Sequence, residues 1–181
     1  MKLTWLNQLP CTYWHNDSWY DLTNIGEVGG AKYWTSKADA FGNMVSFNFC
    51  QKLSHGQKSP DPTAIDCQDM DLYATESTQT NILRPDAICT PLSTSSLDSV
   101  KQTNYTGSVT GTQFTDNISL QYTKDECGLL VVLNCQEDIT EPVISKPYKL
   151  DSTVNSCNLA VEFTSKDVCP QFTTNALWDF M

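Results

Sequence analysis

Eight cysteines spread over almost the whole chain constrain its fold more than any other feature of the sequence. They stand at Cys11, Cys50, Cys67, Cys89, Cys127, Cys135, Cys157 and Cys169. No CxxC occurs, and the two histidines, His15 and His55, lie far apart, so the common zinc spacings are missing. The even number predicts four disulfides and no metal site, which is typical of a protein from an oxidising compartment.

Three Asn-x-Ser/Thr sequons agree with that compartment. They begin at Asn16, Asn104 and Asn117, and such sequons accept N-linked glycans on surface loops of secreted proteins. We expect all three asparagines to be exposed and at least two to carry glycan.

The charge balance excludes two classes of partner. The 21 acidic residues outnumber the 11 basic ones, the formal net charge is -10, and Arg84 is the single arginine. Binding to nucleic acid requires clustered Lys and Arg to neutralise phosphates, and docking on anionic membranes requires a basic patch. The sequence has neither.

Short alternating runs predict an all-β fold. Apolar residues alternate with polar ones at residues 45–50, 118–122 and 159–163, and residues 129–133 form a continuous apolar run of strand length. The 21 Thr and 16 Ser also suit strands with one solvated face. We therefore expect short strands, with turns at residues 55–62, 107–111 and 141–147.

Two segments keep alternative interpretations. Residues 5–24 are ambiguous and could hold a short helix. Residues 90–112, rich in Ser and Thr, fit either a long polar connection or edge strands.

Neither end of the chain contains a clear targeting or membrane-spanning segment. Residues 1–10 contain no apolar run or small-residue cleavage site, so they are not a signal peptide, and we expect an N-terminal extension whose leader was removed. Residues 170–181 turn apolar after the last cysteine. We expect a C-terminal tail that could lead to a membrane span in a longer precursor.

An ordered set of short motifs resembles a known family. The first half contains WYDLTNI at residues 19–25, SFNFC at 46–50 and AIC at 87–89. The second half contains ISLQY at 118–122, VVLNC at 131–135 and CNLAVEF at 157–163. This order, over residues 11–169, resembles the mannose 6-phosphate receptor homology domain.

The resemblance implies a fold and a disulfide pattern. It implies Cys11 with Cys50, Cys67 with Cys89, Cys127 with Cys157, and Cys135 with Cys169. The implied fold is a flattened β-barrel or sandwich of two antiparallel sheets, stapled by four disulfides.

The residues that hold mannose in this family are not matched. The resemblance implies a Gln where this chain has Thr90 and a Tyr where it has Leu159. It implies an Arg within residues 128–134, which contain no basic residue, and a Glu before Cys157, where Glu137, Glu141 and Asp151 are loose candidates. Since buried sugar hydroxyls need paired donors and acceptors, we expect the fold without mannose binding.

The sequence gives little support for a metal site or a catalytic site. His15 beside Asn16 and Asp17 fits a solvated loop better than a metal or acid-base site, and residues 124–126 lack calcium-loop spacing. No GxSxG elbow places a nucleophile. The aromatic residues crowded into the first 34 positions are candidates for core or contact roles. We expect no enzyme, no cofactor and no metal.

The sequence therefore predicts a non-catalytic lumenal or extracellular module that acts through protein contacts. It would be the ectodomain of a type I membrane protein in the Golgi and endolysosomal system, or an accessory subunit of a complex. Two alternatives remain: a lectin or cargo receptor for mannose-type glycans, and a subunit that presents substrate to a glycan-processing enzyme.

Overall fold

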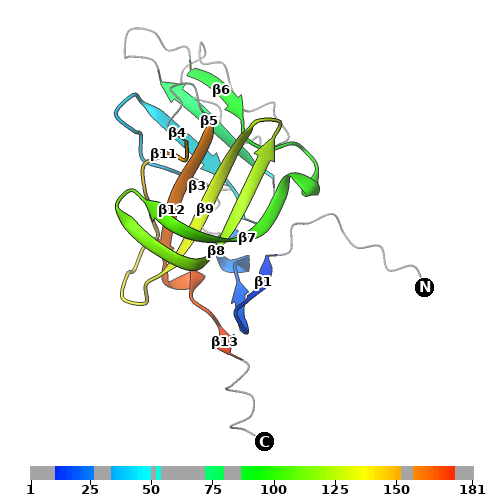
Figure 1. Ribbon diagram of the computed structural model, residues 1–181, viewed down its shortest axis with the longest axis vertical. Coiled ribbons are helices and arrows are strands. Elements are labelled where there is room, and N and C mark those ends of the chain that lie inside the picture. The colour runs from blue at the N-terminus through cyan, green and yellow to red at the C-terminus, as the bar shows by residue number, and fades with distance from the viewer. Residues whose placement is uncertain are drawn as a thin grey trace, which may run out of the picture.

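The computed structural model consists mostly of strands and has almost no helix (Figure 1), as the all-β prediction requires. It describes residues 11–26, 34–49, 52–53, 72–79, 87–151 and 157–173. The strands form three sheets, which we call the N-terminal, middle and large sheets. Among the described residues they form no closed barrel, so the expectation of two antiparallel sheets is met only in part.

The N-terminal sheet joins the two ends of the described chain. It contains β1 (Thr12–His15), β2 (Ser18–Asp21) and, after the last cysteine, β13 (Phe172–Thr173), in the order β1-β2-β13. A four-residue helix, α1 (Thr23–Gly26), follows β2. Residues 5–24, which could have held a helix, thus contain a hairpin over their described part, and α1 overlaps only their end.

A tight turn and a tryptophan pair build this hairpin. The turn residues Asn16 and Asp17 both have positive φ, 48° and 59°, as a two-residue type I′ turn requires. His15 pairs with Ser18 next to the turn, and Trp14 pairs with Trp19 at the next level. The two indoles pack at a centroid distance of 5.0 Å, which is the kind of cross-strand pair that stabilises an antiparallel ribbon.

The middle sheet is antiparallel and has four strands in the order β3-β4-β5-β6. They are β3 (Trp34–Thr35), β4 (Asn43–Phe47), β5 (Ala74–Gln79) and β6 (Ala87–Pro91). The alternation predicted at residues 45–50 appears in β4, where Val45 and Phe47 are fully buried.

The large sheet has six strands, whose main path is β10-β12-β9-β8-β7, with β11 beside β12. The strands are β7 (Val100–Val109), β8 (Thr112–Lys124), β9 (Cys127–Cys135), β10 (Val143–Ile144), β11 (Tyr148–Lys149) and β12 (Asn158–Ser165). Short 3-10 helices, η3 (Leu97–Ser99) and η4 (Lys166–Val168), precede β7 and follow β12. Residues 90–112 therefore contain an edge strand, β7, rather than only a polar connection.

One pair of strands in the large sheet departs from the antiparallel expectation. β12 runs parallel to β9, in register from Asn158 beside Gly128 to Ser165 beside Cys135. Apolar periodicity predicts which face of a strand is buried, but it does not predict the direction of the neighbouring strand. The long connection between β9 and β12 makes the parallel direction possible.

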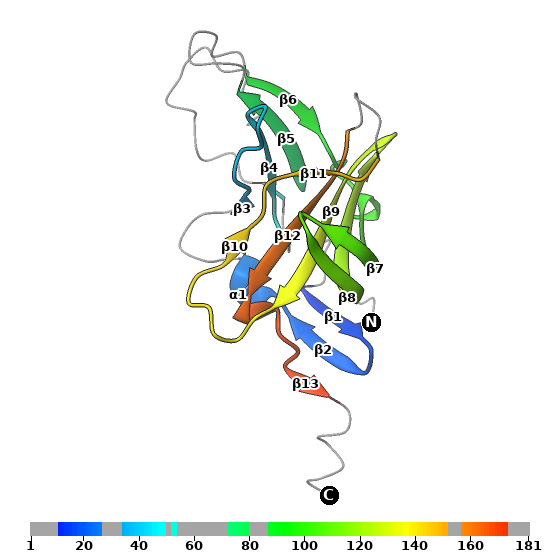
Figure 2. The same cartoon turned by 60° about the vertical axis from the view of Figure 1, so that its left-hand side comes forward.

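The main core lies between the middle and large sheets, which Figure 2 shows as two layers. Phe163 on β12 packs edge-on against Trp34 at 5.2 Å and Phe49 at 4.9 Å between ring centroids. Each such pair adds about 0.5–1.5 kcal/mol beyond the apolar area it buries. The fully buried Tyr122 donates its hydroxyl to the carbonyl of Asn48 at 2.8 Å, so its polar atom is satisfied inside the core.

A second apolar cluster lies on the outer face of the large sheet. Leu130, Val132 and Ala160 face outward from β9 and β12, opposite to the main core, yet all are buried. The tip of the β7–β8 hairpin covers them with Val109 and Phe114, and Figure 1 shows this hairpin curling over the sheet.

A β-bulge accounts for the bend of that hairpin. Tyr105 pairs with Asn117 and Gly107 with Phe114, so Thr106 faces two residues, Thr115 and Asp116. Asp116 has a φ of 52°, and its N–H donates to the Thr106 hydroxyl at 2.9 Å. Since a bulge bends a strand and increases its twist, it directs the hairpin tip onto the sheet.

Candidate functional site

Thr90 and Leu159, the two positions at which the resemblance implied sugar-binding residues, each pair with a charged residue in their sheets. On the middle sheet, Glu76 of β5 stands between Val45 of β4 and Thr90 of β6 in direct cross-strand register. Residues in register point to the same side of a sheet. Because Val45 is fully buried in the core between the sheets, Glu76 and Thr90 lie on the side that faces the large sheet.

On the large sheet, the charged neighbour of Leu159 is an exposed lysine. Lys149 of β11 pairs with Leu159 of β12, and the charge of Lys149 acts on the carboxylate of Glu76. Thr90 and Leu159 thus pair with Glu76 and Lys149 respectively, and Lys149 is near enough for its charge to lower the pKa of Glu76. We call Glu76, Thr90, Lys149 and Leu159 the inter-sheet cluster.

Burial sets the electrostatics of this cluster. The pKa of the half-buried Glu76 is raised, first because burial disfavours its charged form and second because the carboxylate of Asp39 repels it, while Lys149 acts in the opposite direction. Asp39 itself is occupied by the local turn, accepting hydrogen bonds from the backbone N–H groups of Phe41 and Asn43 at 2.8 and 2.9 Å.

The two positions differ in what they offer a ligand. Leu159 is 3% exposed and belongs to the main core, so an apolar side chain stands where a tyrosine hydroxyl was implied. Thr90 is half-buried beside Glu76. On β9, where an arginine was implied, residues 129–133 alternate between the main core and the outer cluster, so none of them presents a polar side chain.

Glu76 and Lys149 were not predicted from the sequence. The strand that carries Glu76 reads ATESTQ, without the apolar alternation that marks a half-buried strand. Lys149 lies in a two-residue strand between turn residues. Neither position has a local signal, since only the packing of two sheets brings them together.

Two of the four expected disulfides are present in the described part. Cys127 bonds to Cys157 and Cys135 bonds to Cys169, across sequence separations of 30 and 34 residues. Cys11 is also disulfide-bonded. Cys50 and Cys67 lie outside the described residues, as does the side chain of Cys89, so the first two expected pairs stay predictions.

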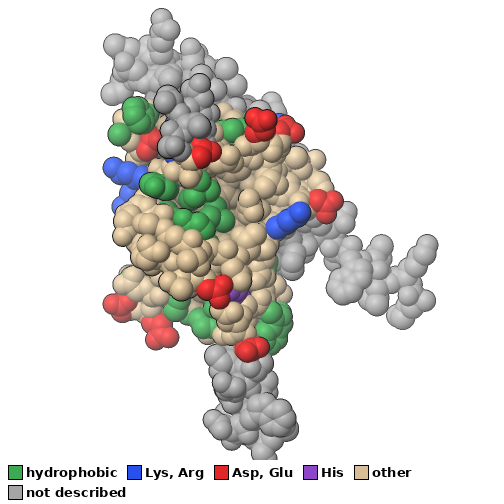
Figure 3. Space-filling view, in the orientation of Figure 1, with side chains coloured by type: hydrophobic (Ala, Val, Ile, Leu, Met, Phe, Trp, Pro, Cys, Tyr) green, Lys and Arg blue, Asp and Glu red, His purple; other side chains and the backbone are tan. Residues whose placement is uncertain are grey.

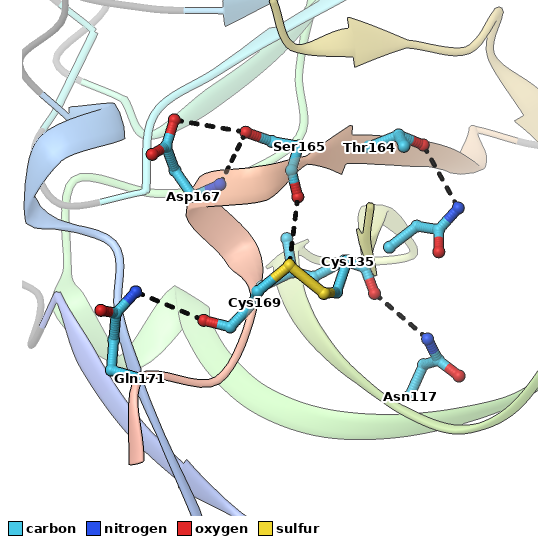
Figure 4. Close-up of a disulfide and its surroundings, with 9 residues drawn as sticks. Asn117, Cys135, Thr164, Ser165, Asp167, Cys169 and Gln171 are labelled. Carbon is cyan, nitrogen blue, oxygen red and sulfur yellow. Dashed lines mark hydrogen bonds between the residues drawn. A yellow bond between two sulfur atoms is a disulfide. The ribbon is translucent and has the colours of Figure 1, made fainter. Parts of the chain in front are cut away.

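Local structure brings Cys169 back to Cys135 (Figure 4). Ser165, the partner of Cys135 in the parallel register, caps η4 by accepting the N–H of Asp167 at 3.1 Å. The single turn of η4 ends where the N–H of Cys169 donates to the carbonyl of Lys166 at 3.2 Å. A serine cap of this kind stabilises a short helical turn, and here the turn reverses the chain onto β9.

The three sequons differ in their surroundings. Asn16 and Asn104 are exposed, as predicted. Asn117 is half-buried, and its amide donates to the carbonyl of Leu133 at 3.2 Å, so the prediction that all three are exposed is wrong for Asn117. The reason is that Asn117 lies within the long strand β8, which has a neighbouring strand on each side in the large sheet. The Thr-rich sequence around Asn117 did not indicate this partial burial.

His15 is not a solvated loop residue. It ends β1, is 8% exposed, and its Nε2 lies 2.6 Å from the carbonyl oxygen of Asp116, to which it donates. The amide of Asn16 donates to the carboxylate of the same aspartate at 2.7 Å. These two bonds attach the N-terminal hairpin to the bulge of the β7–β8 hairpin, which is a structural role. Residues 124–126 span the β8–β9 turn, where Asp125 has a φ of 52°.

Large apolar side chains are exposed along one edge of the large sheet. Val143, Tyr148 and Leu150, on or next to β10 and β11, are 48%, 44% and 41% exposed. We call these three residues the edge patch. Figure 3 shows the outer face of this sheet, where hydrophobic side chains gather over the upper part of β9 and β12.

The disulfides indicate an oxidising compartment. Within the described ranges, no helix has the length and apolar character needed to cross a membrane.

No family model matches the chain, and no curated protein matches its sequence.

Proposed function

We propose that this chain is a non-catalytic module of the secretory pathway that resembles the mannose 6-phosphate receptor homology domain, works through protein contacts and has lost mannose binding. The observation that carries the proposal is the burial of Leu159 in the main core. A site for vicinal hydroxyls needs several polar partners in fixed geometry, and at this position the chain offers an aliphatic side chain instead.

The disulfides support the resemblance behind this proposal. The pairs Cys127 with Cys157 and Cys135 with Cys169 are the ones that the family pattern implies for the second half of the domain. Eight cysteines allow many other pairings, so agreement in two interleaved pairs favours the family over an unrelated disulfide-rich fold.

The edge patch supports protein contacts. Tyr148 and Leu150 lie near each other on one edge and leave apolar area in water, and aromatic and aliphatic anchors of this kind dominate the energetics of interfaces. Partners would be other subunits or a membrane protein of the same compartment.

A second function, a lectin that uses different residues, is favoured by one observation. The half-buried Glu76, with Thr90 beside it and the charge of the exposed Lys149 within range, offers an acceptor, a hydroxyl and a donor. Polar groups of these types can bind sugar hydroxyls.

Titration calorimetry separates the two functions. We expect no saturable heat with mannose or mannose 6-phosphate at millimolar concentration. Saturable binding that is lost in Glu76→Gln but kept in Glu126→Gln, an exposed glutamate in the β8–β9 turn, would establish the lectin and reject the first proposal.

Proximity labelling in secretory cells tests the protein contacts. We expect Tyr148→Ser/Leu150→Ser to lose a labelled partner that the wild type and Phe41→Ser retain. Phe41 is the matched control because it is 79% exposed but lies in the β3–β4 connection of the middle sheet. An unchanged set of labelled proteins would remove the edge patch from the proposal.

A further inference from the structure

The strand β7 lies at one edge of the large sheet. It has 10 residues and lies at the end of the strand order, where it pairs with β8 and with no other described strand. Unpaired N–H and C=O groups on such an edge can accept a strand from another molecule, which leads to self-association. Lys101 is the one charged residue of this strand, so charge protects it only at its start.

Both ends of β7 are already covered or bent. Near its start, the Gln102 amide donates to the carbonyl of Trp14 on β1 at 2.8 Å. Toward its end, the bulge opposite Thr106 bends the hairpin over the sheet. The stretch that remains as a regular free edge lies between these two features, and Asn104 is in it.

Asn104 is also the sequon best suited to carry a glycan in the folded protein. Its side chain is exposed and makes no hydrogen bond with another described residue, and the Thr106 of its sequon is exposed. By contrast, Ser119 of the Asn117 sequon is fully buried, with its hydroxyl donating to the carbonyl of Thr103 at 3.0 Å. The amide of Asn117 is itself engaged with the carbonyl of Leu133.

Asn16 is less suited to carry a glycan than Asn104 and better suited than Asn117. It is exposed, but its Nδ2 atom, the atom to which a glycan would be attached, already donates to the carboxylate of Asp116 at 2.7 Å. A glycan there must share that nitrogen with the bond that holds the hairpin to the bulge.

From this geometry we infer that Asn104 carries an N-linked glycan and that this glycan covers the free edge of β7, keeping the large sheet from adding a strand of a second copy. Charged residues, prolines and bulges keep other edge strands from pairing with a second molecule. A glycan is bulky and well hydrated, so it prevents such pairing in the middle of β7. The inference rests on the secretory location in the proposed function.

The experiment uses the whole chain secreted behind a foreign signal peptide, so its result does not depend on the natural location of the protein. Glycopeptide mapping should find Asn104 occupied and Asn117 less occupied. Thr106→Ser keeps the sequon and Thr106→Ala removes it by changing the same residue, and Asn104→Gln removes it independently. We expect Thr106→Ala and Asn104→Gln, but not Thr106→Ser, to form concentration-dependent oligomers in size-exclusion chromatography.

Trimming of the glycan on the folded wild type by an endoglycosidase, which leaves one sugar on an unchanged Asn104, checks the same point without a substitution, and it should give the same oligomers. An unoccupied Asn104 in secreted protein with intact disulfides, or higher occupancy of Asn117 than of Asn104, would overturn the assignment of the site. Protein that stays monomeric after deglycosylation would overturn the role of the glycan. Each of these results leaves the proposed function standing, because that function is tested by sugar binding and partner labelling.

Discussion

Cys127 and Cys157 stand side by side at the beginning of two parallel strands, since β9 and β12 are in register from Gly128 beside Asn158. Cys135 closes the other end through Cys169. Bridges at both ends of a parallel pair must interleave in the sequence, because the two strand beginnings meet and the two strand ends meet. An antiparallel pair would nest its bridges instead. The interleaved disulfide pattern therefore follows from the parallel direction of β9 and β12.

Removing either bridge should lower the free energy of unfolding by about 3–4 kcal/mol, the loop-closure cost for loops of 30 and 34 residues. The variants are Cys127→Ala/Cys157→Ala and Cys135→Ala/Cys169→Ala, measured by urea denaturation. Similar losses for the two are expected because the loops are similar in length. A loss below about 1 kcal/mol for either would show that the parallel register holds without its clamp.

Gly128→Ala should destabilise the fold by about 1–3 kcal/mol, the usual cost of forcing extra volume into a packed region. A Cβ at this position would lie 2.7 Å from the backbone oxygen of Tyr122 on the neighbouring strand β8, and a backbone atom cannot swing away. The Asn158 side chain is 3.5 Å from the same point. Thermal denaturation of Gly128→Ala with and without Asn158→Ala is the measurement, and rescue by the second change would contradict a backbone clash.

Glu76→Gln should stabilise the protein at neutral pH. Because the folded state raises the pKa of Glu76, the contribution of this carboxyl is most favourable below the unfolded pKa and is lost as pH rises through the folded pKa. The gain from Glu76→Gln should therefore be largest near pH 7–8 and vanish toward pH 4. Solvent screening of a half-exposed group keeps it below about 1 kcal/mol.

Denaturation curves at several pH values test this, with Asp98→Asn as the control because it removes one negative charge from an exposed site on η3. An equal gain in the control would assign the effect to net charge. A gain that grows toward low pH would contradict the sign of the argument.

The Trp14 and Trp19 indoles should be coupled by about 0.5–1.5 kcal/mol, the range for aromatic pairs in contact. A double-mutant cycle with Trp14→Ala and Trp19→Ala isolates this coupling from the loss of buried area. Trp14 is 56% exposed, so its single substitution should cost less than that of Trp19, which is less exposed and pairs with both β1 and β13. Additive single effects would show that the ring contact contributes nothing beyond burial.

Local patterns predicted the main strands because burial on one face leaves a two-residue period in the sequence. The predicted two-residue period appears in β4, where Val45 and Phe47 are in the core, and in β12, where Leu159 and Phe163 are in the core. The turn expected at residues 107–111 is confirmed only at Thr110 and Gly111, which connect β7 to β8 with φ values of 49° and 89°, because β7 continues to Val109. The turn expected at residues 141–147 contains the short strand β10, and the one at residues 55–62 lies outside the described residues. The segment at residues 5–24 was ambiguous because aromatic residues suit helices, strands and cores alike.

The sequence by itself thus determined the all-β class, the positions of the core strands, the acidic surface and the oxidising compartment, because composition and short-range periodicity record them directly. Only the tertiary structure decided that β12 runs parallel to β9, that the Asn117 amide donates to the carbonyl of Leu133, and that the charge of Lys149 on the large sheet acts on Glu76 of the middle sheet. Each of these depends on which distant segments pack together. That choice is made by the summed burial and hydrogen bonding of the whole core, and no local stretch of residues encodes it.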